Sequence, residues 1–474
     1  MTTKDTIKDE RPIVVGIGEV VMDCYDDGTK NLGGAPLIFA YHAIKSHCNG
    51  VIISALGKDC GGKIDDNGIA IKKEAKEKGV SLVYNTVRDK SSGTVVVKSP
   101  QKPQYYITPD AAWSEIKYTK KLKEWEKETK AVYFGTLASS FGGTSKKTID
   151  KFLNAVSEGK TIENVVKDGF LDKDKNVLLK IFDVNLRQDK KGKERITPEQ
   201  TMVIIDYIKK CNVLKINKKE LDVLREIVKI KGKNSDKAGE MLMKQHSNVE
   251  ILILTKGAKG STIFWRDKNR DNNTNEISSQ SIRIKLHPEH TVGAGDAMVG
   301  AFIGELLNGK SISEAYYTAV HRSDKVCRDK DKNSMPKITT PNFFFSYAKV
   351  DSGIVDYFYK KFKNNGLDVW MYDHCKTAGE NTDDNIKKAI INHQVFVYFS
   401  SEAANGSDNV LKELRWFKEK ASDDKKIMII KLDKSSYHKE FHDFLTPLNY
   451  IPFYIFESLD KVYNSDIKPL VQNK

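Results

Sequence analysis

Short apolar segments alternate with helical segments along most of this chain of 474 residues. Each apolar segment has the length of a single strand, and most are followed by a stretch with helical periodicity. This alternation is typical of a doubly wound α/β/α fold, in which helices cover both faces of a parallel sheet. In the first part of the chain, strands are predicted at residues 12–21, 51–56, 132–135, 178–185, 213–217 and 251–255.

Two shorter apolar segments, at 94–97 and 105–107, are flanked by Gly93 and by polar turns. They predict a small separate β-sheet. Residues 157–177 are charged and poor in core residues, and we interpret them as a surface insertion.

The chain changes character after residue 330. Residues 331–341 are polar and contain two prolines, which is typical of a linker. A second alternating unit follows, and its five strands predict a flavodoxin-like fold. We therefore expect a first domain at 1–330, a linker at 331–341 and a second domain at 342–474. The strands of the second domain are predicted at 343–347, 367–372, 395–400, 426–432 and 452–456.

The composition limits the classes of function. Charged residues make up 30% of the chain and hydrophobic residues 39%, as in globular proteins. No apolar run reaches about 18 residues, and the N-terminus lacks an apolar signal region, so we expect no membrane partner and a cytoplasmic location. The formal net charge of +14 comes mostly from lysines spread along the chain, which argues against a specific nucleic-acid site. The 6 cysteines show no metal-type spacing.

The segment 290–296, His-Thr-Val-Gly-Ala-Gly-Asp, leads directly into an apolar helical run. Two glycines beside a small residue at a helix start expose backbone N–H groups at the positive end of the helix dipole. Gly293, Ala294 and Gly295 therefore predict an anion site, with Asp296 beside it. A carboxylate there suits a general base for a hydroxyl that attacks a phosphoryl group. A Gly-rich turn with Asp296 as a helix cap is the alternative.

Two signatures resemble those of the ribokinase-like (PfkB) sugar kinases. Thr-Val-Gly-Ala-Gly-Asp-Ala at 291–297 is similar to the C-terminal one, and Gly33-Gly34-Ala-Pro, preceded by Gly-Glu-Val-Val-Met-Asp23, is similar to the N-terminal one. The resemblance covers about residues 11–330 and implies a ribokinase-like fold with a small β lid, ATP with Mg²⁺, and a sugar or nucleoside ligand. It assigns Asp23 to the sugar hydroxyls, and Gly33 and Gly34 to close approach of the backbone. Ordinary turns are the alternative for all three.

One position departs from the family pattern. Members usually carry Asn three positions after the Ala of Gly-Gly-Ala-Pro, and this chain has Ile38 there. Replacing a hydrogen-bonding side chain by an apolar one predicts a changed choice of sugar.

Three further motifs resemble the nucleotide site of the same family. In Asp-Val-Asn185-Leu-Arg187, polar groups at a strand end would face phosphate, and Arg187 is also assigned to the substrate. Asn217-Lys-Lys-Glu220 is similar to the element that holds Mg²⁺ through water, with a helix cap as the alternative. Gly257 lies in the turn expected under the nucleotide. No Gly-x-x-x-x-Gly-Lys-Ser/Thr pattern occurs, so the P-loop class is not supported.

The second domain resembles a Toll/interleukin-1 receptor (TIR) domain. Phe-Phe-Phe-Ser-Tyr347 is similar to the opening strand, Gly-Leu-Asp-Val-Trp370-Met-Tyr-Asp373 to the second strand, and Ser-Asp-Asn-Val-Leu-Lys-Glu413-Leu to a later helix. Enzymatic TIR domains cleave the nicotinamide–ribose bond of NAD⁺, and the resemblance maps their glutamate to Glu413. A carboxylate suits this reaction because it stabilises oxocarbenium charge. Tyr347, Trp370 and Asp373 are then expected at the NAD⁺ site, although aromatic residues at strand ends also serve as core.

The resemblances lead to one main hypothesis and two alternatives. In the main hypothesis, the chain is an NAD⁺ glycohydrolase regulated by the fused kinase domain and acting in bacterial antiphage defence. In one alternative, it is an ATP-dependent carbohydrate kinase whose TIR domain is a non-enzymatic oligomerisation module. In the other, the kinase fold is a catalytically silent ligand sensor. A homo-oligomer formed through the lid and the TIR domains is also expected.

Overall fold

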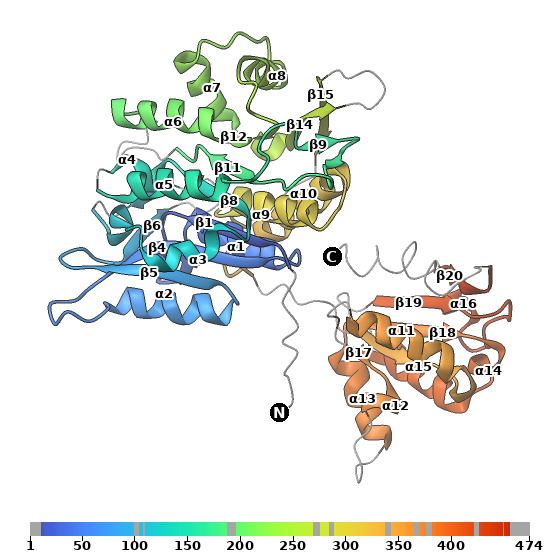
Figure 1. Ribbon diagram of the computed structural model, residues 1–474. Coiled ribbons are helices and arrows are strands. Elements are labelled where there is room, and N and C mark those ends of the chain that lie inside the picture. The colour runs from blue at the N-terminus through green and yellow to red at the C-terminus, as the bar shows by residue number, and fades with distance from the viewer. Residues whose placement is uncertain are drawn as a thin grey trace, which may run out of the picture. The chain divides into compact units, whose positions relative to one another are not determined.

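The computed structural model divides the chain into two compact units, residues 1–336 and 337–474 (Figure 1). The described residues are 11–98, 104–107, 110–141, 143–186, 196–268, 275–283, 289–336, 343–364, 367, 369–375, 382–420, 426–448 and 450–455.

An 11-stranded sheet forms the centre of the first unit. Seven of its strands run parallel, in the order β5-β4-β1-β8-β11-β12-β13, and antiparallel β14 and β15 extend it beyond β13. The sheet is made of β1 (Ile13–Ile17), β4 (Asn49–Gly57), β5 (Ser81–Val87), β8 (Thr129–Gly135), β9 (Val166–Lys167), β10 (Phe170–Leu171), β11 (Leu179–Asp183), β12 (Val213–Asn217), β13 (Ile251–Thr255), β14 (Ser261–Lys268) and β15 (Asn275–Ile282).

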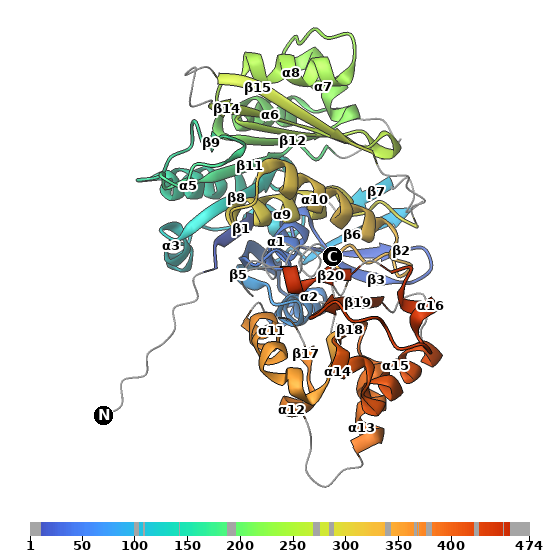
Figure 2. The same ribbon diagram turned by 90° about the vertical axis from the view of Figure 1, so that its right-hand side faces the viewer.

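Helices cover both faces of this sheet, as the alternation predicts. Strand β8 shows the division: Val132 and Phe134 belong to an apolar cluster with α5, α6, α7 and α8, whereas Tyr133 between them stacks on Phe39 of α1. On the second face, α9 contacts both α1 and α10 (Figure 2). The helices are α1 (Ala35–Ile44), α2 (Asp66–Glu77), α3 (Lys120–Glu126), α4 (Leu137–Ser140), α5 (Ser145–Ser157), α6 (Pro198–Lys210), α7 (Lys218–Ile227), α8 (Ser235–Gln245), α9 (Ala294–Leu307) and α10 (Ile312–Cys327).

A second, 4-stranded sheet forms the small lid, in the order β3-β2-β6-β7. It contains the two short strands expected around Gly93, together with the hairpin that follows β1. Its strands are β2 (Val21–Tyr25), β3 (Lys30–Gly33), β6 (Gly93–Lys98) and β7 (Gln104–Ile107).

Two sequence interpretations differ from the structure. Residues 157–177 are not only a surface insertion, because β9 and β10 within them join the edge of the main sheet and bury Val165 and Val166. The first unit also extends to Pro336, beyond the boundary expected at 330. The part of the expected linker at 331–336 contacts the first unit through its backbone carbonyls. Residues 337–341 lie outside the described residues.

The second unit has a 5-stranded parallel sheet in the order β17-β16-β18-β19-β20, a flavodoxin-like arrangement. Apolar clusters on its two faces hold the helices. The strands are β16 (Phe343–Ser346), β17 (Val369–Trp370), β18 (Val395–Ser400), β19 (Lys426–Lys431) and β20 (Tyr450–Pro452), and the helices are α11 (Ser352–Asn364), α12 (Tyr372–Cys375), α13 (Thr382–Asn392), α14 (Glu402–Asn405), α15 (Asp408–Lys420) and α16 (His442–Leu445).

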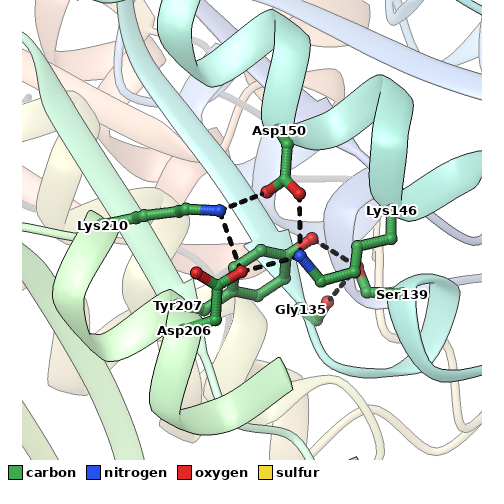
Figure 3. Close-up of polar contacts among 7 residues, drawn as sticks. All are labelled: Gly135, Ser139, Lys146, Asp150, Asp206, Tyr207 and Lys210. Carbon is green, nitrogen blue, oxygen red and sulfur yellow. Dashed lines mark hydrogen bonds and ion pairs between the residues drawn. The ribbon is translucent and has the colours of Figure 1, made fainter. Parts of the chain in front are cut away.

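A ring of four charges joins α5 to α6 in the first unit (Figure 3). Lys146 Nζ lies 2.7 Å from carboxylate oxygens of both Asp150 and Asp206. Lys210 Nζ lies 2.8 Å from the same two carboxylates. Both ammonium groups also lie over the Tyr207 ring, at 5.1 and 5.7 Å from its centroid. The ring therefore covers a buried tyrosine whose hydroxyl contacts Ser139 Oγ in α4 at 2.7 Å.

We expect Asp206→Asn to weaken the first unit because it removes the carboxylate charge that both lysines share. The loss should be about 1 kcal/mol of unfolding free energy at low ionic strength and should shrink as salt screens the pairs. Urea unfolding of the full chain at two salt concentrations measures this loss. Asp222→Asn, which removes the exposed pairs to Lys218 and Arg225 in α7, is the matched control and should cost about half as much or less. Equal losses in both variants at both salt concentrations would contradict a cooperative ring.

Candidate active sites

The predicted anion site lies at the N-terminus of α9. Gly293 caps the helix with a left-handed φ of 72°, and a side chain there would also collide with Ser334, whose Cβ lies 2.4 Å from the position of an added Cβ. Ala294 begins the helix, and Asp296 lies in its first turn with 9% of its surface exposed. The backbone N–H groups of the helix start and the Asp296 carboxylate thus lie side by side.

A buried lysine lies directly beneath this loop. A Cβ added to Gly295 would lie 3.2 Å from Lys215 Nζ, which in turn lies 3.0 Å from Asp183 Oδ1. Burial alone would lower the pKa of Lys215, but the carboxylates of Asp183, Glu220 and Asp296 hold it above its ordinary value. The ammonium group of Lys215 therefore lies beside the helix start and is paired there with Asp183.

Tyr133 completes this cluster from β8. Its hydroxyl lies 2.6 Å from Asp183 Oδ2 and 2.9 Å from Asp296 Oδ1. The sequence analysis assigned no role to Tyr133 or Lys215. One signal for Lys215 was present, because a lysine inside the short apolar segment 213–217 is unusual for a strand buried on both faces.

The residues assigned to the sugar gather around the start of α1. The Asp23 carboxylate lies against the backbone of Gly33, since a Cβ there would be 2.3 Å from Asp23 Oδ2. Gly34 caps α1 with a φ of 108°, which favours glycine. Ile38 is buried in α1, and its Cδ1 would be 3.0 Å from a Cβ on Gly293. The apolar side chain that replaces the family's asparagine thus packs beside the anion loop.

The residues assigned to the nucleotide lie at the carboxyl ends of β11, β12 and β13. Asn185 follows β11 with a φ of 43°. Asn217 and Glu220 form a reciprocal capping box at the start of α7, and Glu220 also accepts the backbone N–H of Leu186 at 3.0 Å. Burial raises the pKa of Glu220 to about 7, against the opposing charge of Lys215. Gly257 is exposed in the turn after β13, and Arg187 lies outside the described residues.

In the second unit, Glu413 of α15 reaches the carboxyl end of β16. Ser346 Oγ donates a hydrogen bond to Glu413 Oε2 at 2.6 Å. Desolvation raises the pKa of Glu413 to about 8, although the hydrogen bond from Ser346 opposes the shift. Tyr347 donates to Asp373 Oδ2 at 2.8 Å, and burial together with this carboxylate raises the pKa of Tyr347. Four polar side chains thus meet at one edge of the sheet.

Trp370 has a different environment from the other residues assigned to the NAD⁺ site. Its ring stacks on Phe344 at a centroid distance of 4.8 Å and packs against the apolar cluster beneath α13 and α15. This is the environment of a core residue, which is the alternative to a place at the NAD⁺ site.

Comparisons with known proteins agree with this architecture. Residues 14–337 match the family model described as pfkB family carbohydrate kinase, and residues 343–462 match the model described as TIR domain. Comparison with the curated proteins gives no match.

Three solved structures share the fold of the first unit. Their sequence identities to this chain are too low to assign its function. A putative ribokinase II from E. coli has 16% identity and a TM-score of 0.52, with 68% of this chain and 95% of that chain covered. Fructokinase from Vibrio cholerae O395, crystallised with fructose, ADP and calcium ion, has 18% identity and a TM-score of 0.51, with 69% and 95% covered. A PfkB family carbohydrate kinase from Listeria grayi DSM 20601 has 14% identity and a TM-score of 0.50, with 68% and 96% covered.

The doubly wound sheet, its four-stranded lid and the aspartate at the start of α9 define a ribokinase-like protein with a second α/β domain at its C-terminus. The chain belongs to the pfkB family of carbohydrate kinases, and its C-terminal unit is a TIR domain. Within the part of the chain that the structure describes, no helix has both the length and the apolar character needed to cross a membrane.

The raised pKa of Glu413 predicts how the stability of the TIR domain depends on pH. Between an unfolded pKa of about 4.5 and a folded pKa of about 8, the folded state holds a proton that the unfolded state releases. The stability that protonated Glu413 contributes to the folded state is therefore complete below the unfolded pKa. It is lost as the pH rises through the folded pKa. Wild type should lose stability between about pH 6 and about pH 8, and Glu413→Gln should lose less.

Scanning calorimetry of the full chain at the two pH values measures this difference. Glu402→Gln is the control, because Glu402 is exposed and lies in α14, just before the helix α15 that carries Glu413. This variant should keep the wild-type pH dependence. An unchanged pH dependence in Glu413→Gln would show that this carboxyl group ionises normally.

Proposed function

We propose that the chain is an NAD⁺ glycohydrolase of bacterial antiphage defence, whose TIR domain is regulated by the fused carbohydrate kinase domain. The kinase domain would phosphorylate a sugar or nucleoside with ATP. One observation carries the proposal: each unit places one carboxylate, Asp296 or Glu413, in a largely desolvated cluster of polar side chains at the carboxyl edge of a parallel sheet. Ligands of α/β proteins bind at such edges.

In the kinase site, Asp296 would act as general base for the acceptor hydroxyl. The backbone N–H groups at the start of α9 and the ammonium group of Lys215 would stabilise charge on the transferred phosphoryl group. Asp23 would accept hydrogen bonds from the sugar hydroxyls. The buried position of Ile38 beside Gly293 supports its predicted effect on sugar choice.

Magnesium fits this site only through water. Both carboxylate oxygens of Glu220 accept backbone N–H groups, from Asn217 at 2.7 Å and from Leu186 at 3.0 Å. Their remaining lone pairs could accept hydrogen bonds from metal-bound water, which Mg²⁺ retains readily. When bound, the ion would neutralise phosphate charge. A cluster of three or more metal-ligating side chains is not found among the described residues.

We expect Asp296→Asn to lower the rate of phosphoryl transfer by on the order of 10²–10⁴, because it removes a positioned base. The measurement is product formation from ATP and a panel of sugars and nucleosides, read by chromatography. Asp222→Asn on the exposed side of α7 is the control and should keep the wild-type rate. Phosphorylation at the normal rate by Asp296→Asn would reject the assignment.

In the TIR site, Glu413 would stabilise the oxocarbenium charge that develops as the nicotinamide–ribose bond breaks. The carboxyl group must be ionised for this role, whereas its raised pKa keeps it mostly protonated near neutral pH. The arrangement therefore supports low basal activity, and an activating change would have to ionise Glu413. Ser346 and Tyr347 lie where they could orient it.

The contacts of residues 331–336 support regulation by the kinase domain. We call this segment the strap. It touches the lid through hydrogen bonds from Tyr25 and Asn31 and through an ion pair between Lys332 and Asp27. It also touches the anion loop, where Ser334 lies against Gly293. A ligand that shifts the lid would thus act on the segment that leads into the second unit.

A kinase whose TIR domain only assembles is the second candidate. The raised pKa of Glu413 favours this second candidate, because a protonated carboxyl group does not stabilise positive charge. Exposed Val96 and Tyr106, which are cross-strand partners in the lid, would suit a self-association surface. NAD⁺ incubation with the full chain discriminates between the two candidates.

We expect the purified full chain to consume NAD⁺ slowly, and a phosphorylated sugar or nucleotide to stimulate this consumption. Glu413→Ala should abolish the consumption of NAD⁺. Asp27→Ala should reduce the stimulation by about 1.5- to 5-fold, the range of one exposed ion pair. Chromatography of NAD⁺ and nicotinamide measures both effects.

Two controls accompany this experiment. Asp26→Ala changes an exposed carboxylate in the same turn and should leave the stimulation unchanged. The segment 341–474 alone should lose the response. A response that this segment retains would reject coupling to the kinase domain, and NAD⁺ loss that persists in Glu413→Ala would reject the catalytic assignment.

A further inference from the structure

The hydroxyl of Tyr133 lies between two carboxylates in the interior of the kinase domain. Tyr133 and Asp183 are completely buried, and Asp296 is 9% exposed. The two oxygen–oxygen distances, 2.6 Å to Asp183 and 2.9 Å to Asp296, are both hydrogen-bond distances. A phenol has one hydrogen to donate, so it cannot donate to both carboxylates at once. At any moment Tyr133 therefore donates to one carboxylate, and the other carboxyl group can donate to Tyr133 Oη only when it is protonated.

Lys215 determines which carboxylate keeps its charge. Its ammonium group lies 3.0 Å from Asp183 Oδ1, and both side chains are buried. The Asp183–Lys215 pair is therefore internally neutralised, and removing the charge from Asp183 would leave Lys215 uncompensated. Asp296, at the start of α9 and at the anion loop, is the member of the cluster placed to exchange a proton with a substrate. Among the residues that the structure describes, Glu220 of α7 also faces this cluster and acts on Lys215.

We propose that Tyr133 is a positioning residue of phosphoryl transfer, whose hydroxyl turns from Asp296 to Asp183 as Asp296 takes up the substrate proton. The inference rests on the proposed kinase function. Before transfer, the Tyr133 O–H donates to the Asp296 carboxylate and holds it ionised as a base. After transfer, protonated Asp296 donates to Tyr133 Oη, and the Tyr133 hydrogen points to Asp183, which Lys215 keeps negative.

The step balances in atoms and charge. The acceptor O–H bond breaks and its proton moves to Asp296, while the acceptor oxygen forms a bond to the γ-phosphorus of ATP. The bond from that phosphorus to the bridging oxygen breaks, and ADP leaves with the electron pair. Each carboxylate keeps a hydrogen-bond donor, because Lys215 donates to Asp183 throughout, and the phenolic hydrogen is donated to Asp296 before transfer and to Asp183 after it.

The chain offers a substitution that isolates the hydroxyl. The Tyr133 ring stacks on Phe39 at a centroid distance of 4.8 Å, so Tyr133→Phe keeps the packing and removes only the oxygen. Tyr207 gives a matched control, because it is equally buried and its hydroxyl contacts the neutral Ser139 Oγ at 2.7 Å. Tyr207→Phe therefore removes a buried hydroxyl that touches neither carboxylate.

Two measurements on the full chain test the proposal. With an acceptor found in the panel, Tyr133→Phe should lower kcat by about 10- to 100-fold, the range for one hydrogen bond to a charged group, with KM for ATP unchanged. Independently of activity, the ¹³C signal of the Asp296 carboxyl, assigned by its loss in Asp296→Asn, should titrate at higher pH in Tyr133→Phe than in wild type. Tyr207→Phe should match wild type in both measurements.

The outcomes separate this inference from the proposed function. A wild-type kcat, or a raised KM for ATP with unchanged kcat, would overturn the positioning role. An unmoved Asp296 titration in Tyr133→Phe would overturn it even if no acceptor is phosphorylated. Failure of the wild-type chain to phosphorylate any acceptor would instead count against the proposed kinase function, while the titration still decides the arrangement of Tyr133 and Asp296.

Discussion

The ion pair between Lys215 and Asp183 is the interaction on which the kinase site depends. Two opposite charges lie opposite each other on the neighbouring strands β11 and β12, 3.0 Å apart, with Asp183 completely buried and Lys215 almost so. Removing either one would leave a buried charge uncompensated, which costs about 3–5 kcal/mol. The pair also sets the environment of its neighbours, because Tyr133, Asp296 and the backbone of Gly295 all lie against it.

Much of the fold could be predicted from the sequence, because parallel strands buried on both faces appear as continuous apolar segments. The six strands predicted in the first unit are all present, and so is the small lid. The prediction was wrong where burial comes from pairing with a distant edge. Residues 157–177 look like an insertion by composition, yet β9 pairs with β14 about a hundred residues later in the chain, a contact that local periodicity does not encode.

The candidate sites were less accessible to sequence reasoning, for two physical reasons. Sequence motifs point to the residues that match family signatures, such as Asp296 and Glu413. They do not point to residues that reach the site only through tertiary contacts. Tyr133 belongs to an ordinary apolar strand, and only the fold brings its hydroxyl to α9. Desolvation is the second reason. The environment that raises the pKa of Glu413 is built by β16 and α15, which are far apart in the chain. The domain boundary at Pro336 was missed because contacts through backbone carbonyls leave no pattern in the side chains.

The strap, residues 331–336, is held to the kinase domain partly through its main chain. Hydrogen bonds reach it from Asn31, Tyr25, His42, Lys78 and Tyr41, and the carbonyls of Asp331, Lys332, Ser334, Met335 and Pro336 accept them. Every residue supplies a carbonyl, so these hydrogen bonds do not depend on the side chains of the segment. The buried side chains of Ser334 and Met335 and the ion pair of Lys332 with Asp27 do depend on its sequence. A substitution at the exposed Asp331 should therefore leave the carbonyl contacts in place, whereas substitutions at Ser334 or Met335 would disturb the packing against the kinase domain.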